Sequence, residues 1–295
     1  MRLKWRSIPG IVIIAAVLGL AGLYRLRAPV VLVVADEFTG LYGKRRSLVK
    51  QAEISLKLFR RVRLAPIADG ASADVVAFAA VEAAVGPYAV LFPSIYQQGA
   101  RHYAEQAPGI PVAVLGFPPG AGAGGLVFIE TDRKTDFYRA GCCAAIFARA
   151  GGGGVLFFTG DAGNGDARQA FSKGLMDQGF EDPPLFVDRG ENYTPSEGIS
   201  CVVMAAPAQA YLDNNPAIPT ILFSWMDPGI TPREIKLIVD DSPWAQAAAA
   251  VKLLHPAQSS GLTPIPSEIL IPRGRIGDEA LRREIKKAVE RKYID

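Results

Sequence analysis

The chain has 295 residues, of which 49% are hydrophobic and 21% charged, and its net charge is +3 at pH 7. This composition excludes a largely disordered chain, and the length is sufficient for one large or two medium domains with buried cores. Nucleic-acid binding requires a more concentrated basic face, so no nucleic-acid partner is expected. Two histidines and three cysteines without metal-ligand spacing indicate neither a histidine-based triad nor a metal site, and no cofactor is expected.

The first 28 residues predict a membrane-directed segment. An apolar run of sixteen residues (8–23) is preceded by basic residues at 2–6 and followed by Arg25 and Arg27. It is marginal for crossing about 30 Å of hydrocarbon and slightly long for the apolar part of a cleaved signal. Leu23 stands where lipoprotein processing requires cysteine, so lipidation is not expected.

We predict an uncleaved, single-pass signal anchor over residues 1–28 in the cell inner membrane. The basic leader favours a cytoplasmic N-terminus, which places the body of the protein in the periplasm. Cleavage of the segment and a buried helix of a soluble domain are the alternatives.

From residue 29 onward, short apolar runs alternate with helical patterns. Several runs, such as VVLVVA and GVLFF, are continuously apolar, which is typical of parallel strands buried on both faces. The expected strands are 30–35, 63–68, 89–93, 112–117, 126–131, 154–159, 185–187, 201–205, 220–223, 236–239 and 268–271. The expected helices are 43–61, 71–85, 95–107, 134–150, 167–178, 207–214, 243–254 and 277–292.

Alternating strands and helices predict a doubly wound α/β fold with parallel sheets. Two successive sets of such units predict two lobes. We expect an N-terminal lobe over residues 29–131, completed by about 228–256 and the C-terminal helix. The C-terminal lobe would comprise residues 132–227, completed by about 257–276.

Ligands of open parallel sheets bind beyond the carboxyl ends of the strands. Carboxylates there would accept hydrogen bonds from hydroxyl or amino groups, and aromatic faces would cover the apolar side of a ring. The sequence therefore predicts a cleft for a small polar, ring-shaped ligand. Candidate contacts at these strand ends are Asp36, Phe38, Ser94, Phe117, Asp132, Trp225, Asp227 and Asp241.

The stretch FFTGDAGNGDAR, residues 157–168, joins an apolar strand to a helix through a glycine-rich turn. Its glycines have neither the phosphate-loop spacing nor the dinucleotide-binding order, and Asp161 and Asp166 would repel phosphate. We therefore expect the turn to deliver Arg168 into the first turn of a helix, where its planar fork of donors can bind hydroxyls or a carboxylate. The alternative is that Arg168 forms a salt bridge with Asp132 or Asp166.

Residues 128–180 resemble the central segment of type I periplasmic solute-binding proteins. The shared pattern is a strand ending near Asp132, a small-residue helix with Ala140-Gly141 and Ala144-Ala145, a strand ending at Gly160, Arg168 ahead of Phe171, and Gly179 closing the next helix. The stretch DFYRAGCCAA looks most like the basic membrane protein branch, which includes nucleoside-binding lipoproteins. The resemblance implies two Rossmann-like lobes joined by a hinge, no catalysis, and an ABC permease or a membrane sensor as partner.

By position, the resemblance also implies ligand contacts. Asp36 and Phe38 match residues that hold the ring, Arg168 matches a ligand-binding arginine, Asp227 matches a hydroxyl-binding aspartate, and Asp241 matches a polar contact before a helix.

Two positions depart from the sugar-binding pattern. Gly116-Phe117-Pro118 and Ala206-Pro207 stand where sugar binders have polar residues. A more apolar ring, such as that of a nucleoside, would be accommodated more easily by the aromatic side chains Phe38, Phe117, Phe137 and Trp225.

Structural roles remain open for several candidates: Asp132 could cap the helix that follows it, Asp36 and Asp227 could cap helices or pair with arginines, and Phe38 and Trp225 could pack between the lobes. The alternative functions are a ligand-free binding-protein fold that docks to an envelope partner, and an enzyme that uses Asp36 with Asp227 as paired carboxylates. A DNA-binding regulator of the LacI type would need a helix-turn-helix where this chain has its apolar N-terminal run.

Overall fold

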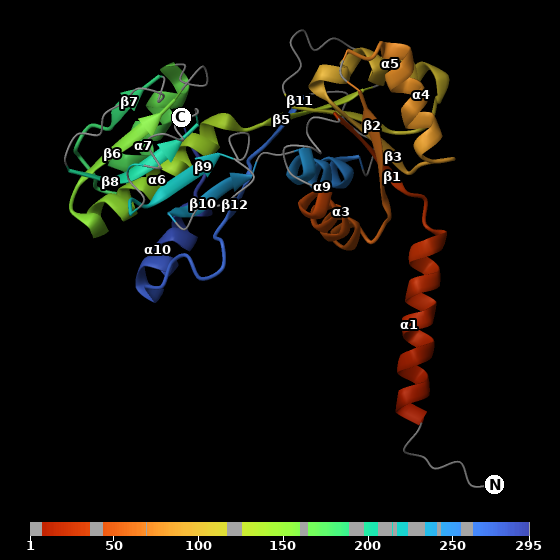
Figure 1. The fold of residues 1–295 in the computed structure, drawn as a ribbon, viewed down its shortest axis with the longest axis horizontal. Coiled ribbons are helices and arrows are strands. Elements are labelled where there is room, and N and C mark those ends of the chain that lie inside the picture. Colours follow the sequence, from red (N-terminus) through yellow and green to blue (C-terminus); the bar gives the residue numbers. More distant parts are fainter. Residues whose placement is uncertain are drawn as a thin grey trace. The chain divides into compact units, whose positions relative to one another are not determined.

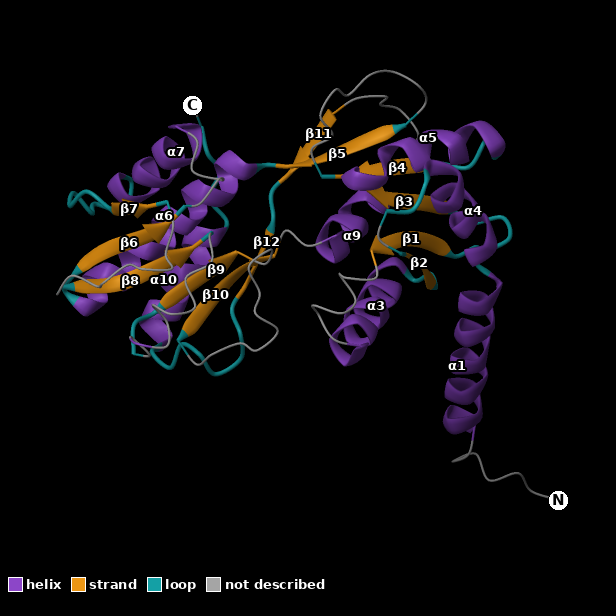
Figure 2. Cartoon of the chain, turned by 45° about the horizontal axis from the view of Figure 1, so that its top comes forward, coloured by secondary structure: helices purple, strands orange, loops and turns teal. Residues whose placement is uncertain are grey.

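The chain forms two α/β units, shown as a ribbon in Figures 1 and 2. The computed structural model describes residues 8–35, 44–68, 70–116, 126–159, 165–188, 198–205, 214, 217–223, 234–240, 243–254 and 262–294. The first unit comprises residues 1–129 and 247–263, and the second comprises residues 130–246 and 264–295. By this division the chain passes between the units after residues 129, 246 and 263.

The first unit is built on a six-stranded sheet of order β11-β5-β4-β3-β1-β2. Its strands are β1 (Val30–Ala35), β2 (Val62–Ile67), β3 (Ala89–Pro93), β4 (Val112–Leu115), β5 (Val127–Thr131) and β11 (Leu262–Ile265). The pairs from β2 to β5 are parallel. Its helices are α1 (Ile8–Leu26), α3 (Lys44–Leu58), α4 (Ala73–Ala83), the 3-10 turn η2 (Ser94–Tyr96), α5 (Gln97–Gln106) and α9 (Pro243–Leu253).

The second unit repeats this strand order as β12-β10-β9-β8-β6-β7. Its strands are β6 (Gly154–Phe158), β7 (Leu185–Val187), β8 (Ile199–Met204), β9 (Thr220–Phe223), β10 (Ile235–Asp240) and β12 (Glu268–Leu270). The pairs from β7 to β10 are parallel, and β12 runs antiparallel to β10. The helices are α6 (Arg133–Gly151), α7 (Gly165–Met176) and α10 (Glu279–Val289).

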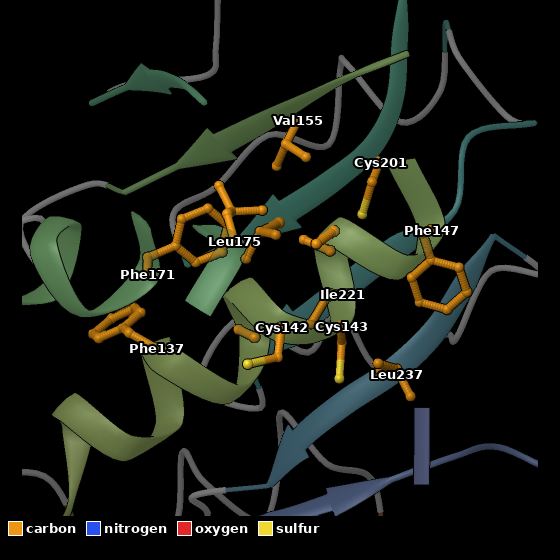
Figure 3. Close-up of a cluster of buried hydrophobic side chains, with 14 of the residues drawn as sticks. Phe137, Cys142, Cys143, Phe147, Val155, Phe171, Leu175, Cys201, Ile221 and Leu237 are labelled. Atoms are coloured by element: carbon orange, nitrogen blue, oxygen red, sulfur yellow. The ribbon is translucent and has the colours of Figure 1, made fainter. Parts of the chain in front are cut away.

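Side chains on both faces of each sheet are buried, as continuously apolar strands require. In the first unit, α4 and α5 cover one face, and α3 and α9 lie on the other side (Figures 1 and 2). In the second unit, α6, α7 and α10 pack on the face formed by alternate strand residues. Figure 3 shows this cluster, which includes Phe137, Cys143 and Phe147 of α6, Phe171 of α7 and Ile221 of β9.

Helices α6 and α7 approach closely because two glycines face the contact. A methyl group on Gly141 would lie 2.2 Å from the carbonyl oxygen of Phe171, and one on Gly174 would lie 2.2 Å from that of Tyr138. Backbone therefore packs on backbone along this pair of helices.

The structure confirms the doubly wound α/β fold and the expected strands, with shifts of one or two residues at some ends. It adds β11, whose four residues LTPI were not predicted. The division differs from the expected one in three elements: β10 and α10 belong to the second unit, and β11 pairs in the first sheet. The expected helix 207–214 lies outside the described residues except for Asn214.

The apolar N-terminal run is helical over Ile8–Leu26. Within the described part of the chain, no helix meets the length and hydropathy needed to cross a membrane.

Candidate functional site

The carboxyl ends of β6 and β7 bring three polar side chains together in the second unit. Thr159 follows β6, Asp188 follows β7, and these two strands are parallel neighbours. The hydroxyl of Thr159 donates a hydrogen bond of 2.8 Å to Oδ1 of Asp188, and the guanidinium of Arg168 donates to the same oxygen. Arg168 lies in the first turn of α7, as the sequence predicts.

Thr159 is fully buried, whereas the side chains of Arg168 and Asp188 are 37% and 70% exposed. The guanidinium of Arg168 also lies 5.1 Å from the ring centroid of Phe186 in β7. The hydrogen bond from Thr159, followed by the positive charge and hydrogen bond of Arg168, lowers the pKa of Asp188, with desolvation opposing the shift. The carboxylate is therefore held ionised at the end of the sheet.

This arrangement presents donors and an acceptor within a few ångströms of each other. Nε of Arg168 is buried and has no hydrogen-bond partner among the described residues. Ligand hydroxyls could accept hydrogen bonds from the guanidinium or donate to the carboxylate of Asp188. A ligand carboxylate would instead compete with Asp188 for Arg168.

The salt-bridge alternative for Arg168 holds, but with a different partner from the two expected. Asp188 pairs with Arg168, whereas Asp166 lies 3.3 Å from Nζ of Lys134. Asp132 caps α6, because its Oδ1 accepts a hydrogen bond of 3.1 Å from the backbone N–H of Thr135.

A second polar group lies beside this cap, at the carboxyl end of β5. Nε2 of Gln246 donates a hydrogen bond of 2.9 Å to Oγ1 of Thr131, the last residue of β5. The backbone N–H of Asp132 donates to the carbonyl oxygen of Ile265 at 2.8 Å. Asp132 is therefore held at a strand end by a backbone hydrogen bond, and its side chain caps α6 through Oδ1.

In the first unit, Ser94 opens η2 directly after β3. It lies beside Gly116, which follows β4 with a φ of +89°. A methyl group on Gly116 would lie 3.1 Å from Oγ of Ser94, so the glycine leaves room beside the hydroxyl. Ser94 is thus placed at the carboxyl edge of the first sheet, as its position in the sequence predicts.

Phe137 lies in the core of the second unit. It is only 2% exposed, and its ring centroid is 4.9 Å from that of Phe223 and 5.7 Å from that of Phe157 (Figure 3). We attribute this ring to core packing and leave it out of the proposed ligand contacts. Six other candidates, Asp36, Phe38, Phe117, Trp225, Asp227 and Asp241, lie outside the described residues.

Sequence reasoning missed Thr159 and Asp188 as polar partners. Asp188 directly follows the expected strand 185–187 and Thr159 ends the expected strand 154–159, so inspection of strand ends, as for Ser94, could have found both. Strand β7 has only three residues, none of them buried, so the sequence gives only a weak signal for the residue that follows it.

The three cysteines do not contribute chemistry to the site. Cys142, Cys143 and Cys201 are free and buried, and desolvation raises the pKa of each thiol. Within the described residues, no group of three or more histidine, cysteine, aspartate or glutamate side chains could hold a metal ion.

A cavity of about 390 Å³ lies at the amino ends of the strands of the second sheet. Its lining includes Phe147 and Gly151 of α6, Ile199 of β8, Lys236 of β10 and Ile276 before α10. None of the ten ligand-binding candidates lines it.

No family model matches the sequence, and no curated protein is detectably similar to it. Solved structures do match. An ABC transporter periplasmic solute-binding protein from Actinobacillus succinogenes 130z with bound D-allose is 16% identical, with a TM-score of 0.52, covering 84% of this chain and 99% of that one. AraP, an arabinose-binding protein from Geobacillus stearothermophilus, is 14% identical, with a TM-score of 0.53 and coverages of 84% and 98%.

A transcriptional activator of the comK gene from Bacillus halodurans is also 14% identical, with a TM-score of 0.57 and coverages of 89% and 96%. These structures share the repeated doubly wound architecture of the two units. The chain therefore has the fold of the type I periplasmic binding proteins, a fold that solute-binding proteins and transcriptional regulators both use.

Proposed function

We propose that the chain is an extracytoplasmic solute-binding protein, without catalysis of its own, that closes its two units on a small polar ligand containing a ring. The polar group of Arg168, Thr159 and Asp188 carries this proposal. It stands at the carboxyl end of β6, next to the point where the strand order of the second sheet reverses. Open α/β sheets bind their ligands at this point.

Sugar-like and nucleoside-like ligands both suit this group. The solved structures with bound D-allose and with arabinose-binding function support a sugar. The glycine at position 116 and the Ala206-Pro207 pair favour a more apolar ring, because they supply no side-chain hydroxyl or carboxylate there. Ser94, Asp132 and the candidates outside the described residues remain the other proposed contacts.

The proposed location is the periplasmic side of the inner membrane, reached through the N-terminal segment, with an ABC permease or a membrane sensor as partner. Helix α1 exposes large apolar side chains, including Leu18 at 67% and Leu26 at 87%. Such a surface is suited to an apolar phase rather than to water.

A second candidate is a binding-protein fold that has lost its ligand and docks to an envelope partner. One observation favours it: the guanidinium of Arg168 is already paired with the internal carboxylate of Asp188. A ligand would have to share or displace that contact.

Titration calorimetry of the full chain with D-allose, arabinose and adenosine tests the proposal. We expect one of these ligands to bind, and Arg168→Ala to weaken its binding at least tenfold, because a charge-assisted hydrogen bond contributes about 1.5–3 kcal/mol. Arg283→Ala is the matched control, since among the described residues Arg283 of α10 pairs with Glu279 on its own helix and with no other carboxylate. Equal affinities for the Arg168 and Arg283 variants would contradict the proposed site.

A further inference from the structure

The junction between α1 and the first unit gathers aromatic and guanidinium side chains. The ring centroid of Phe59 lies 5.7 Å from that of Tyr24 and 5.0 Å from the guanidinium carbon of Arg27. The guanidinium of Arg60 stacks on the ring of Tyr88 at 3.5 Å. We define the basic-aromatic collar as Tyr24, Arg25, Arg27, Phe59, Arg60 and Tyr88.

The backbone at Phe59 has an unusual conformation. Its φ is +49°, and no other non-glycine residue in the described part of the chain has a positive φ. The position follows the last residue of α3, where helices commonly end on a left-handed glycine. This conformation strains the backbone of a phenylalanine. The ring placed there contacts Tyr24 and Arg27.

In the part of the chain that the structure describes, no carboxylate pairs with the guanidinium groups of the collar. Among the described residues, Arg25, Arg27 and Arg60 form no ion pair. Burial and then the charge of Arg27 lower the pKa of Arg60, so these two guanidinium groups repel each other. An external anion bound here would relieve that repulsion.

The collar residues Phe59, Arg60 and Tyr88 stay close to the end of α1. Helix α1 ends at Leu26 and β1 begins at Val30, so three residues join them. At about 3.3–3.6 Å per residue, the start of the sheet stays within roughly 15 Å of the helix end. The guanidinium of Arg60 also donates a hydrogen bond of 3.1 Å to the carbonyl oxygen of Ala28 in this connection. A surface that takes up the exposed apolar side chains of α1 would therefore also reach the collar.

Helix α3 also combines exposed apolar side chains with an excess of basic residues. Leu48, Val49 and Leu56 are 63%, 60% and 75% exposed. Leu48 and Leu56 are eight residues apart and share one helix face. The helix carries five basic residues, Lys44, Arg45, Arg46, Lys50 and Lys57, against one acidic residue, Glu53. Exposed apolar side chains on a basic helix are typical of segments that lie on membrane surfaces.

We propose that the basic-aromatic collar, with the exposed face of α3, seats the first unit on an anionic lipid bilayer. The guanidinium groups of the collar bind lipid phosphates, and the rings of Tyr24, Phe59 and Tyr88 lie at the headgroup level, where aromatic residues are enriched. The inference rests on the proposed membrane-associated location, and it goes beyond that location by assigning the lipid class and the residues that bind it.

Vesicle binding by the full chain tests this inference, with vesicles of phosphatidylcholine alone and of phosphatidylcholine mixed with phosphatidylglycerol. We expect stronger binding to the anionic vesicles. Arg25→Gln with Arg27→Gln should weaken that binding roughly 30-fold, because each surface cation contributes about 1 kcal/mol. Binding to phosphatidylcholine alone should not change, and high salt should remove the difference between wild type and variant.

Lys286→Gln with Lys287→Gln removes the same charge from the exposed face of α10 and is the matched control. If Arg27→Gln disturbs folding, as circular dichroism would report, Arg25→Gln alone should weaken binding about fivefold. The collar is refuted if the arginine variants bind anionic vesicles as the lysine control does, or if the wild type does not distinguish the two vesicles. A chain that prefers anionic vesicles but binds no sugar or nucleoside would refute the proposed function and leave the collar standing.

Discussion

Arg168 makes two contacts within the second unit, one with the carboxylate of Asp188 and one with the ring of Phe186. Its place in the first turn of α7 could be predicted, because a glycine-rich segment separates the apolar strand pattern from the helical pattern in the sequence. Asp188 could be found as a residue that follows a strand, but not as the partner of Arg168, because the pairing of β7 with β6 is not a local property of the sequence.

The Asp188 contacts should make stability depend on pH at the acid end. The pKa of Asp188 is lowered in the folded chain, so below the unfolded value of about 3.9 the unfolded state binds more protons than the folded state. The stabilisation from this carboxylate is therefore present above that value and is lost as pH falls through the folded pKa. Urea unfolding of wild type and Asp188→Asn should differ at pH 7 and converge in acid. A difference that persists below the folded pKa would contradict this account.

Phe137 tests the distinction between core and ligand contact. Phe137→Ala should lower the free energy of unfolding by about 3–5 kcal/mol, since it removes a ring packed between two others. Phe78→Ala is the control, because Phe78 is 60% exposed on α4 and its loss should change stability by less than about 0.5 kcal/mol. If urea denaturation gives equal losses for both variants, the core assignment of Phe137 fails.

At the scale of elements, period and apolarity predicted most of the strands and helices, because parallel strands buried on both faces have a distinct composition. The exceptions have physical causes. Strand β11 is short and contains Pro264, which local patterns read as a strand breaker. It forms because β5 offers it an edge to pair with. Likewise α10 has a clear amphipathic pattern, but only tertiary packing on α6 decides which unit it joins.

The close contact of α6 and α7 gives a prediction for one glycine. Gly174→Ala would place a methyl group 2.2 Å from the carbonyl oxygen of Tyr138, so the helices must separate at a cost of about 1–3 kcal/mol. In Gly165→Ala, at the start of the same helix, no atom of the described residues lies within 4 Å of the added methyl group. Its effect should be neutral or slightly stabilising. Thermal unfolding distinguishes the two, and similar melting temperatures would exclude the close approach.

At the scale of the whole molecule, the chain enters the second unit at residues 130 and 264, and a buried carboxylate ties these two entries together. Asp136 of α6 is fully buried and accepts hydrogen bonds from the backbone N–H of Ser267 at 2.8 Å and from its hydroxyl at 2.6 Å. Arg139 of the same helix donates to the carbonyl oxygen of Arg291 at 2.7 Å. These contacts hold the C-terminal segment to the start of α6.

Asp136→Ala should leave both donors of Ser267 without their acceptor. Each buried donor left unpaired should lower the free energy of unfolding by roughly 1–3 kcal/mol. Hydrogen exchange should then show faster opening of the segment around residue 267. Asp278→Ala, which removes only the exposed cap of α10, should leave that segment protected. Unchanged exchange at residue 267 in the Asp136 variant would show that the carboxylate does not hold this segment.

One measurement addresses the central claim directly: a thermal-shift screen of the full chain against sugars, nucleosides, amino acids and their derivatives. A ligand at about 100 times its dissociation constant should stabilise the folded chain by about 2.7 kcal/mol, which is a clear rise in melting temperature. A hit that is lost in Arg168→Ala and retained in Arg283→Ala is the predicted result. An unchanged melting temperature across the whole panel would contradict a solute-binding function and favour the ligand-free envelope protein.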